Sequence, residues 1–407
     1  MVAVLALLGM ALLGAACGGS GGSSGGSTAG GSAEASGGPG PGGYLDWPYF
    51  GRVPERTHYL PAHGRALDPP LKEAWSINTH GLIEFPPAIA GGVAYVINKY
   101  GNGKAVRLAD RKVLWELNLR PEDKGKPLDV TGPAYAEGRV FNAFIDGYIA
   151  AGDAATGEKI WVDHLHAHLE SSPLAIGGRL YLGTDTTDVL CLDAGDGKIL
   201  WRFNSPAAIK ASPSYHDGRL FVADYESSMF ALDPKNGKPL WRTNTSKVPP
   251  GGEGGFFSSP AIGFGRVYAA RDDGVVYAFD EKTGKVDWAF PTGAAIYGSP
   301  AVARVPGTAP TVYIGAENGT LYALDARTGK VRWQAGIGGP IPGTATVIGH
   351  TVYTSSFKTQ KTVGFDVRTH RRTFEANQAG YTPVVSDGRR LYLIGYYTLV
   401  GLQPTRR

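Results

Sequence analysis

The chain has 407 residues, of which 43% are hydrophobic and 19% are charged, and its formal net charge is +4 at pH 7. That length allows two or three ordinary domains or one long repeat domain, and the weak, nearly balanced charge argues against a nucleic-acid surface. Cys17 and Cys191 are the only cysteines, which excludes a disulfide framework and a thiolate metal site.

The N-terminus predicts an export signal. The run from Val2 to Ala16 is apolar and holds no Lys or Arg. It is too short to span a bilayer as a helix of about 20 residues, but it suits the hydrophobic region of a secretion signal. It ends in Leu13-Gly-Ala-Ala-Cys17, which resembles a bacterial lipoprotein box, although Gly14 stands where Leu is usual and the basic leader is missing. We expect a lipoprotein signal peptide over residues 1–16 with lipid attachment at Cys17; the alternative is an ordinary signal peptide cut near Ala16.

Two segments separate this signal from the repeats. Residues 18–43 are almost wholly Gly, Ser, Ala and Pro, so with Cys17 they form an expected domain of a lipidated cysteine and a disordered linker, residues 17–43. Residues 44–70 contain Trp47, Tyr49 and Phe50. We expect them to form a lead-in that covers a face or an edge of the folded domain, with its prolines keeping it out of a sheet interior.

From Leu71 onward one frame recurs. In Ala323 to Trp333, a short apolar strand leads to Asp325, Thr328 and Gly329, which are turn residues, and a return strand ends at Trp333. A fixed period of this kind indicates a repeat architecture. The aromatic anchors lie 40–47 residues apart: Trp75, Trp115, Trp161, Trp201, Trp241, Trp288, Trp333 and Phe374. The copies that end at Trp115 and Phe374 depart from this pattern, because they have Arg111 and His370 in place of Gly.

The frame is similar to the tryptophan-docking repeat, Ala-x-Asp-x-x-Thr-Gly-x-x-x-Trp, of pyrroloquinoline-quinone (PQQ)-type β-propellers. The resemblance covers nearly the whole chain after the first seventy residues and implies four-stranded blades around a channel, with a structural docking role for the Trp anchors. It does not imply that the quinone is bound, because many such propellers are not enzymes.

Counting strands predicts how the ring closes. The chain ends with three strands, near residues 382–385, 390–394 and 398–402, and begins with a lone strand over 71–77. Joining them gives an all-β, eight-bladed propeller over residues 71–407. Its blades are four-stranded and antiparallel, and the last is closed by the N- and C-terminal strands, which removes exposed sheet edges.

Chemistry in a propeller collects where loops converge at the end of the channel. Three residues before the first-strand Pro, or its equivalent, the repeats carry Glu84, Val130, Glu170, Lys210, Phe257, Tyr297, Pro342 and Gly380. If the repeats superpose, these residues ring one mouth, and Glu84, Glu170, Lys210, Phe257 and Tyr297 are the candidate binding residues. In quinone enzymes of the resembling family a similar level holds cofactor and calcium; the alternative is a solvated rim without catalysis.

Two further features are candidates for binding. The long loops Leu117 to Thr131 and Thr243 to Phe257 would lie above one rim, where they could bind a partner or a ligand. The alternative is that they have no role in binding. His164, His166 and His168 alternate and would share one strand face with Glu170. Because side chains on one strand face lie about 6.6 Å apart, they are weak metal candidates; a pH-sensitive cluster or a solvated loop is the alternative.

The sequence holds no Cys-x-x-Cys-His haem motif, no adjacent cysteines and no placeable catalytic set. The eight blades and the anchor are similar to the propeller lipoproteins of the outer-membrane β-barrel assembly machinery, which implies a scaffold. We therefore expect a non-catalytic, lipid-anchored extracytoplasmic monomer in the periplasm or at the cell surface. It would bind envelope proteins through rim loops and the membrane through Cys17, without nucleic acid, PQQ or calcium. The alternatives are a PQQ-dependent alcohol or sugar dehydrogenase and a saccharide- or small-ligand-binding propeller.

Overall fold

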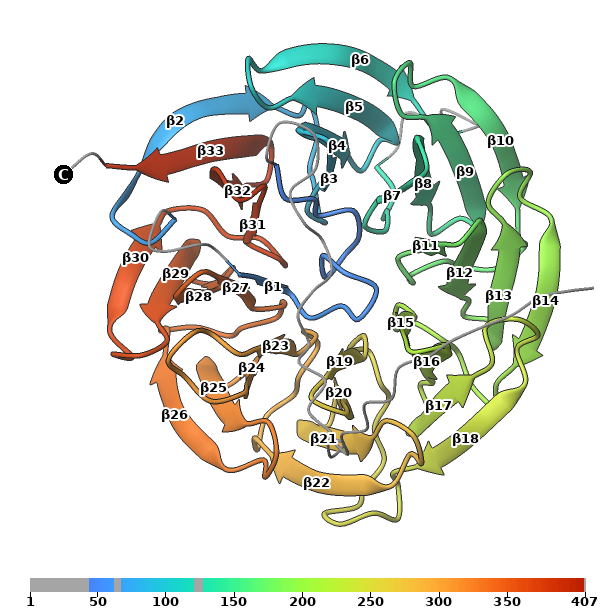
Figure 1. Cartoon of the computed structure of the whole chain (residues 1–407), viewed down its shortest axis with the longest axis vertical. Coiled ribbons are helices and arrows are strands. Elements are labelled where there is room, and N and C mark those ends of the chain that lie inside the picture. Colours follow the sequence, from blue (N-terminus) through green and yellow to red (C-terminus); the bar gives the residue numbers. More distant parts are fainter. Residues whose placement is uncertain (1–43, 62–66, 121–126, 406–407) are drawn as a thin grey trace, which may run out of the picture. The chain divides into compact units, whose positions relative to one another are not determined.

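Eight β-sheets stand in a ring around a central channel, and each sheet is one blade (Figure 1). The computed structural model describes residues 44–61, 67–120 and 127–405. The predicted signal peptide, the lipid site at Cys17 and the linker therefore lie outside the described residues. Within the described part, every regular element is a β-strand, so the predicted all-β, eight-bladed propeller is confirmed.

The first seven blades follow each other along the chain, each with its strands numbered from the channel outward. Blades 1 and 2 hold β3 (Ala88–Ala90), β4 (Val93–Ile97), β5 (Asn102–Arg107), β6 (Lys112–Asn118), β7 (Ala134–Ala136), β8 (Arg139–Ala143), β9 (Tyr148–Asp153) and β10 (Lys159–His164). Blades 3 and 4 hold β11 (Leu174–Ile176), β12 (Arg179–Gly183), β13 (Asp188–Asp193), β14 (Ile199–Asn204), β15 (Ser214–His216), β16 (Arg219–Ala223), β17 (Ser228–Leu232) and β18 (Pro239–Asn244). Blades 5 and 6 hold β19 (Ala261–Gly263), β20 (Arg266–Ala270), β21 (Val275–Asp280), β22 (Val286–Pro291), β23 (Ala301–Ala303), β24 (Thr311–Gly315), β25 (Thr320–Asp325) and β26 (Val331–Gly336). Blade 7 holds β27 (Thr346–Ile348), β28 (Thr351–Ser356), β29 (Lys361–Asp366) and β30 (Arg372–Ala376).

Blade 8 is assembled from both ends of the chain, as the strand count predicted. It contains β31 (Val384–Ser386), β32 (Leu391–Ile394), β33 (Thr398–Pro404) and, as its outer strand, β2 (Leu71–Asn78). β2 runs antiparallel to β33 with Trp75 opposite Gly401, and the pair lies at the left of Figure 1. Because β33 pairs with β2, the ring has no open end.

The Trp anchors dock each blade onto the next. The Nε1–H of Trp288 in blade 5 donates to the Ala326 carbonyl of blade 6 at 3.1 Å. Its ring rests on Gly329, where a Cβ would lie 2.6 Å from the indole. The same pair of contacts, Nε1 to the carbonyl after the turn Asp and ring on the turn Gly, is made by Trp115, Trp161, Trp201 and Trp241. The repeated Gly is therefore required for space as well as for its positive φ, which is +70° at Gly329.

The docking contact changes where the repeat lacks its turn glycine. Trp333 meets blade 7, whose turn has His370 in place of Gly, and the two rings stack with centroids 5.1 Å apart. Both His370 and Arg111 adopt positive φ, 61° and 65°, so the turn conformation persists without its glycine. These substitutions flank blade 8, where β2–β33 pairing provides an additional connection.

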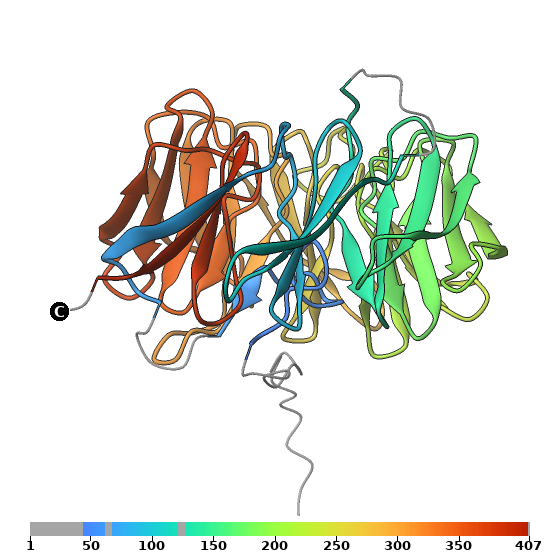
Figure 2. The ribbon, with the colours of Figure 1, turned by 90° about the horizontal axis from the view of Figure 1, so that it is seen from above.

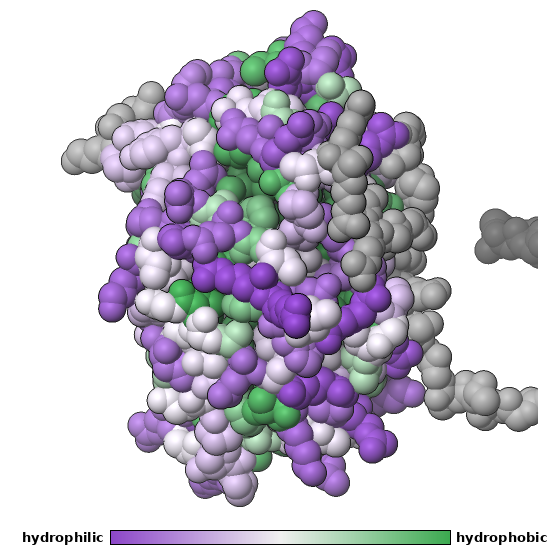
Figure 3. Space-filling view, turned by 90° about the vertical axis from the view of Figure 1, so that its left-hand side faces the viewer, coloured by the Kyte–Doolittle hydropathy of each residue, from purple (hydrophilic) through white to green (hydrophobic). Residues whose placement is uncertain are grey.

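Burial differs between the inner strands and the outermost strand of a blade. The three inner strands of each blade are largely buried, whereas the fourth strand exposes aliphatic side chains. Exposed aliphatic residues on these outer strands are Val113, Leu114, Leu117, Ile160, Val162, Ile199, Leu200, Leu240 and Val331. On the side of the ring seen in Figure 3, apolar residues form separate patches between polar ones.

The lead-in covers the inner edges of the blades, which agrees with the expectation that it covers a face or an edge. It lies inside the ring, where β1 (Tyr59–Leu60) pairs parallel with β27, and Figure 2 shows it toward the lower end of the propeller. Trp47 and Leu60 are fully buried. Residues 45–60 bond in turn to the inner part of every blade, from blade 8 through blades 1 to 7: Leu45 to Asp387, Trp47 to Ile89, Pro48 to Tyr135, the Tyr49 hydroxyl to Ala175, Pro54 to Tyr215, Glu55 to Ile262, Thr57 to Val302 and His58 to Val347.

One pair between blades makes stability depend on pH. His216 of blade 4 and Glu281 of blade 5 are joined by a 2.7 Å Nδ1–Oε1 contact, and this hydrogen bond raises the pKa of His216. The pair's contribution to the free energy of unfolding is complete below the pKa of about 6.5 that histidine has in the unfolded chain. It is lost as pH rises through the raised pKa of His216 in the folded protein. The thermal midpoint of the wild type, followed between about pH 5 and 9, should therefore fall relative to that of Glu281→Gln as pH rises. Parallel curves for the two proteins would contradict this.

Candidate functional site

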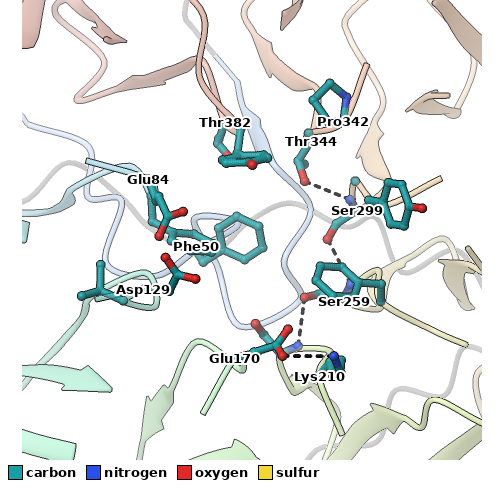
Figure 4. Close-up of a pocket in the computed structure, with 18 of the residues that line it drawn as sticks. Phe50, Glu84, Asp129, Glu170, Lys210, Ser259, Ser299, Pro342, Thr344 and Thr382 are labelled. Carbon is teal, nitrogen blue, oxygen red and sulfur yellow. Dashed lines mark hydrogen bonds and ion pairs between the residues drawn. The ribbon is translucent and has the colours of Figure 1, made fainter. Parts of the chain in front are cut away.

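A pocket of about 530 Å³ opens at one end of the channel (Figure 4). The structure brings seven of the eight predicted ring positions together in its lining: Glu84, Val130, Glu170, Lys210, Phe257, Tyr297 and Pro342. Gly380 lies beside it, in a smaller adjoining pocket of about 220 Å³ that shares Glu84 and Tyr381. The five candidate binding residues thus lie around one cavity, here called the mouth pocket.

The walls of the mouth pocket are held by a chain of hydrogen bonds between blades. The backbone N–H of one blade donates to the hydroxyl of the next: Gly132 to Ser172, Ser172 to Ser212, Ser212 to Ser259, Ser259 to Ser299, and Ser299 to Thr344, at 2.9–3.0 Å. Figure 4 shows part of this chain beside Ser259, Ser299 and Thr344. These hydroxyl residues are not among the predicted site residues, although a Ser directly before the first-strand Pro in four repeats was a usable signal.

The floor of the mouth pocket comes from the lead-in. Phe50 lies in the middle of the ring of labelled residues in Figure 4, packs edge-on against Phe85 at 5.6 Å and is buried. Arg56 fixes this floor, because its guanidinium donates to the carbonyls of Phe50, Ser172 and Pro213. Burial lowers the pKa of Arg56 to about 9, since desolvation disfavours the charged form.

Each charged residue of the ring is paired with an opposite charge. Lys210 Nζ lies 3.1 Å from Glu170, and Lys99 bridges Glu84 at 2.8 Å and Asp129 at 2.5 Å. Burial raises the pKa of Glu84 despite this partner. Lys210 also lies over the rings of Tyr225 and Phe257, with Nζ 5.1 and 5.8 Å from their centroids. These contacts orient the ring and leave only part of its charge available to a ligand.

Exposed aromatic side chains gather on the face that carries the mouth pocket. Tyr225, Phe257, Tyr297 and Tyr381 line it, and Tyr396 lines the adjoining pocket. Among the described residues, the exposed aromatic side chains are these five together with Tyr100 and Tyr397, which lie in the β4–β5 and β32–β33 turns at the same end of the blades. We call this set the aromatic face.

The two long loops differ in what the structure describes. Residues 121–126 of the first lie outside the described residues, while its Asp129 and Val130 line the mouth pocket. The second is tied down, because buried Arg271 donates to the carbonyls of Gly251 and Gly252 and pairs with Asp273. This loop therefore supplies a fixed part of the rim.

The predicted histidine alignment is wrong. β10 ends at His164, and His166 adopts a positive φ of 53°, so the three side chains do not share a strand face. His164 and His166 contact each other through their Nδ1 atoms at 3.0 Å, His168 pairs with Asp185 at 3.2 Å, and Glu170 pairs with Lys210 instead. Within the described residues no three His, Cys, Asp or Glu side chains are grouped to hold a metal ion.

Repeat sequence, ring closure and docking contacts define a PQQ-like repeat β-propeller. The chain belongs to the family whose model is described as outer membrane protein assembly factor BamB, which matches residues 65–176, 145–252 and 186–398. The crystal structure of BamB from Moraxella catarrhalis superposes with a TM-score of 0.66 at 17% identity, covering 83% of this chain and 98% of that chain.

Quinone dehydrogenases are also similar. Quinohemoprotein alcohol dehydrogenase from Comamonas testosteroni superposes with a TM-score of 0.73 at 16% identity, covering 89% of this chain and 81% of that chain. The dehydrogenase subunit of alcohol dehydrogenase (quinone) from Komagataeibacter europaeus is 33% identical over 125 residues, which are 28% of this chain and 17% of that protein. 1-Butanol dehydrogenase (cytochrome c) from Thauera butanivorans is 28% identical over 153 residues, 34% of this chain and 22% of that protein. The chain thus spans less than a quarter of these two curated relatives, and both structural likenesses show the fold alone.

Proposed function

We propose that the chain is a non-catalytic scaffold that binds other cell-envelope proteins through its aromatic face. The observation that carries this proposal is the separation of exposed side chains: aromatic ones surround the mouth, and aliphatic ones lie on the outer strands. Tyrosine and other aromatic residues dominate the energetics of protein interfaces because each buries a large area. Membership in the BamB family supports the same reading.

Lipid anchoring at Cys17 and an extracytoplasmic location belong to this proposal. They rest on the apolar N-terminal run and its lipoprotein-like end. In the part of the chain that the structure describes, no helix has the length and apolarity needed to cross a bilayer. Replacing Cys17 with alanine should abolish incorporation of labelled fatty acid; retained label would remove the lipid anchor from the proposal.

The scaffold proposal is tested by crosslinking and pull-down from native membranes. A Phe257→Ala, Tyr297→Ala, Tyr381→Ala chain is expected to lose its partners, because the three rings lie around the mouth. The matched control, Ile160→Ser, Leu200→Ser, Leu240→Ser, changes exposed outer-strand residues and should keep them. An unchanged partner list in the aromatic variant, or the reverse pattern, would contradict the proposal.

The quinone dehydrogenases make a second candidate function worth testing, but the mouth does not fit their cofactor. Pyrroloquinoline quinone carries three carboxylates, whereas the pocket lining presents Glu84, Asp129, Glu170 and Glu317 with Lys210 as its lysine. That lysine is already paired, and the described residues form no metal-binding group. We therefore leave PQQ and calcium out of the proposal. Dye reduction by the full chain given quinone, calcium and an alcohol or sugar would overturn that choice.

A further inference from the structure

The mouth pocket already holds one cation in a way that suggests how it binds another. The Lys210 ammonium lies over two aromatic rings, those of Tyr225 and Phe257, and pairs with the Glu170 carboxylate. A cation over an aromatic face is attracted by the negative charge of the ring face, and more strongly when it is desolvated. An aromatic wall next to a carboxylate is thus a cation site in this pocket.

The neighbouring blade offers the same combination without a cation. Glu317 lies in the β24–β25 turn of blade 6, and its N–H donates to the carbonyl of Ala295, two residues before Tyr297, at 2.9 Å. Glu317 and Tyr297 both line the mouth pocket. Glu317 Oε1 is buried and lacks a hydrogen-bond partner, and the described residues include no cation paired with Glu317. Burial raises the pKa of this carboxyl group. Glu317 as a whole is partly exposed and lines the pocket, and a hydrogen-bond donor on a ligand would supply the partner that its carboxylate lacks.

The tyrosine side of this site is open to a ligand. Tyr297 is 43% exposed and packs edge-on against Phe257 at 6.0 Å, so its ring is held while much of its surface remains free. The pocket volume of about 530 Å³ is within the range of about 300–1,000 Å³ typical of ligand sites. Phe50 lines the pocket from below, so a ligand enters from the aromatic face.

We propose that the mouth pocket binds an extended segment of a partner protein through a lysine or arginine side chain, whose cationic group lies against Tyr297 and pairs with Glu317. This inference rests on the proposed scaffold function and names the chemistry of its partner. Charge complementarity favours it, because Lys99 and Lys210 already pair with Glu84, Asp129 and Glu170. Glu317 is therefore the lining carboxylate for which the described residues supply no cation. A neutral saccharide would also stack on Tyr297 but would leave the Glu317 charge uncompensated.

The test uses a random-sequence peptide display library selected on the full chain. Selected peptides should share a Lys or Arg at one position, and a synthetic copy with citrulline in place of Arg should bind at least about tenfold more weakly. Glu317→Gln should weaken the Arg peptide by a similar factor and remove the preference over citrulline, while Tyr297→Ala should weaken both peptides. Glu158→Gln is the matched control, since this carboxylate is exposed in the β9–β10 turn, away from the pocket lining.

Selection without basic residues, or equal affinity of Glu317→Gln and wild type for the Arg peptide, would overturn the inference. So would saturable binding of maltotriose that requires Tyr297 when no basic peptide binds. Because glutamine has nearly the shape of glutamate, an unchanged thermal midpoint is expected; Glu317→Asp keeps the charge and should retain the preference for Arg if Glu317→Gln unfolds. If the membrane partners require Tyr297 but not Glu317, the scaffold proposal holds and this inference is wrong. If basic peptides bind through Glu317 but no membrane partner is found, the pocket binds a basic side chain and the scaffold proposal is wrong.

Discussion

Replacing Trp288 with alanine is expected to lower the free energy of unfolding by about 3–5 kcal/mol. The indole is buried between blades 5 and 6, so truncation leaves a cavity against Gly329 and removes the hydrogen bond to the Ala326 carbonyl. Urea denaturation of the full chain, followed by circular dichroism, measures the change. Gly329→Ala should destabilise as well, because a Cβ there would approach the indole to 2.6 Å.

The chain supplies its own control for this prediction. Trp333 occupies the equivalent position in blade 6, but it is only half-buried and stacks on His370, whereas Trp288 meets Gly329. Trp333→Ala should therefore cost clearly less than Trp288→Ala. Equal losses at the two sites would show that the glycine contact does not determine the strength of docking.

Replacing Arg56 with methionine is expected to destabilise the protein by at least about 3 kcal/mol. The substitution keeps most of the aliphatic volume but leaves the carbonyls of Phe50, Ser172 and Pro213 without their donor. Lysine should not rescue it, because one ammonium does not reproduce the planar fork of a guanidinium. Urea denaturation gives the stability, and limited proteolysis within residues 44–60 reports release of the lead-in.

Arg52 is the matched control for Arg56. It is also buried in the lead-in, but its guanidinium donates to one carbonyl, that of Tyr59, at 3.2 Å. Arg52→Met should therefore cost less and should leave the lead-in more resistant to protease than Arg56→Met does. If Arg52→Met proved the more damaging change, the anchoring role assigned to Arg56 would be wrong.

The blades could be predicted from the sequence because their signals are local and repeated. Each docking hairpin carries its own Asp, Gly and Trp within eleven residues, and the frame that predicts the hairpin also fixes the contact with the next blade. The ring of residues such as Glu170, Lys210 and Phe257 followed from this regularity, since equivalent positions of superposed repeats share one end of the channel.

The path of the lead-in could not be predicted, because it has no period and its contacts depend on backbone groups. Glu55 and Thr57 bond to blades 5 and 6 through their carbonyls, which any residue could offer. The alignment of His164, His166 and His168 was mispredicted for a related reason. Their alternation assumed a continuing strand, whereas the chain leaves β10 at His164 and turns at His166. Glu317 is unpaired because no cationic side chain from another described part of the chain reaches it, and a local sequence pattern cannot predict that.

The winding lead-in also determines how the ring responds to mechanical load. Tyr44 lies against Arg389 and beside Gly92, in turns at the opposite end of the blades from the mouth. A pull applied upstream of Tyr44 therefore acts on the base of the propeller, where Leu45, Trp47 and Pro48 are bonded to three different blades. We expect tension at this point to be divided among these three blades, so that it does not act on a single sheet.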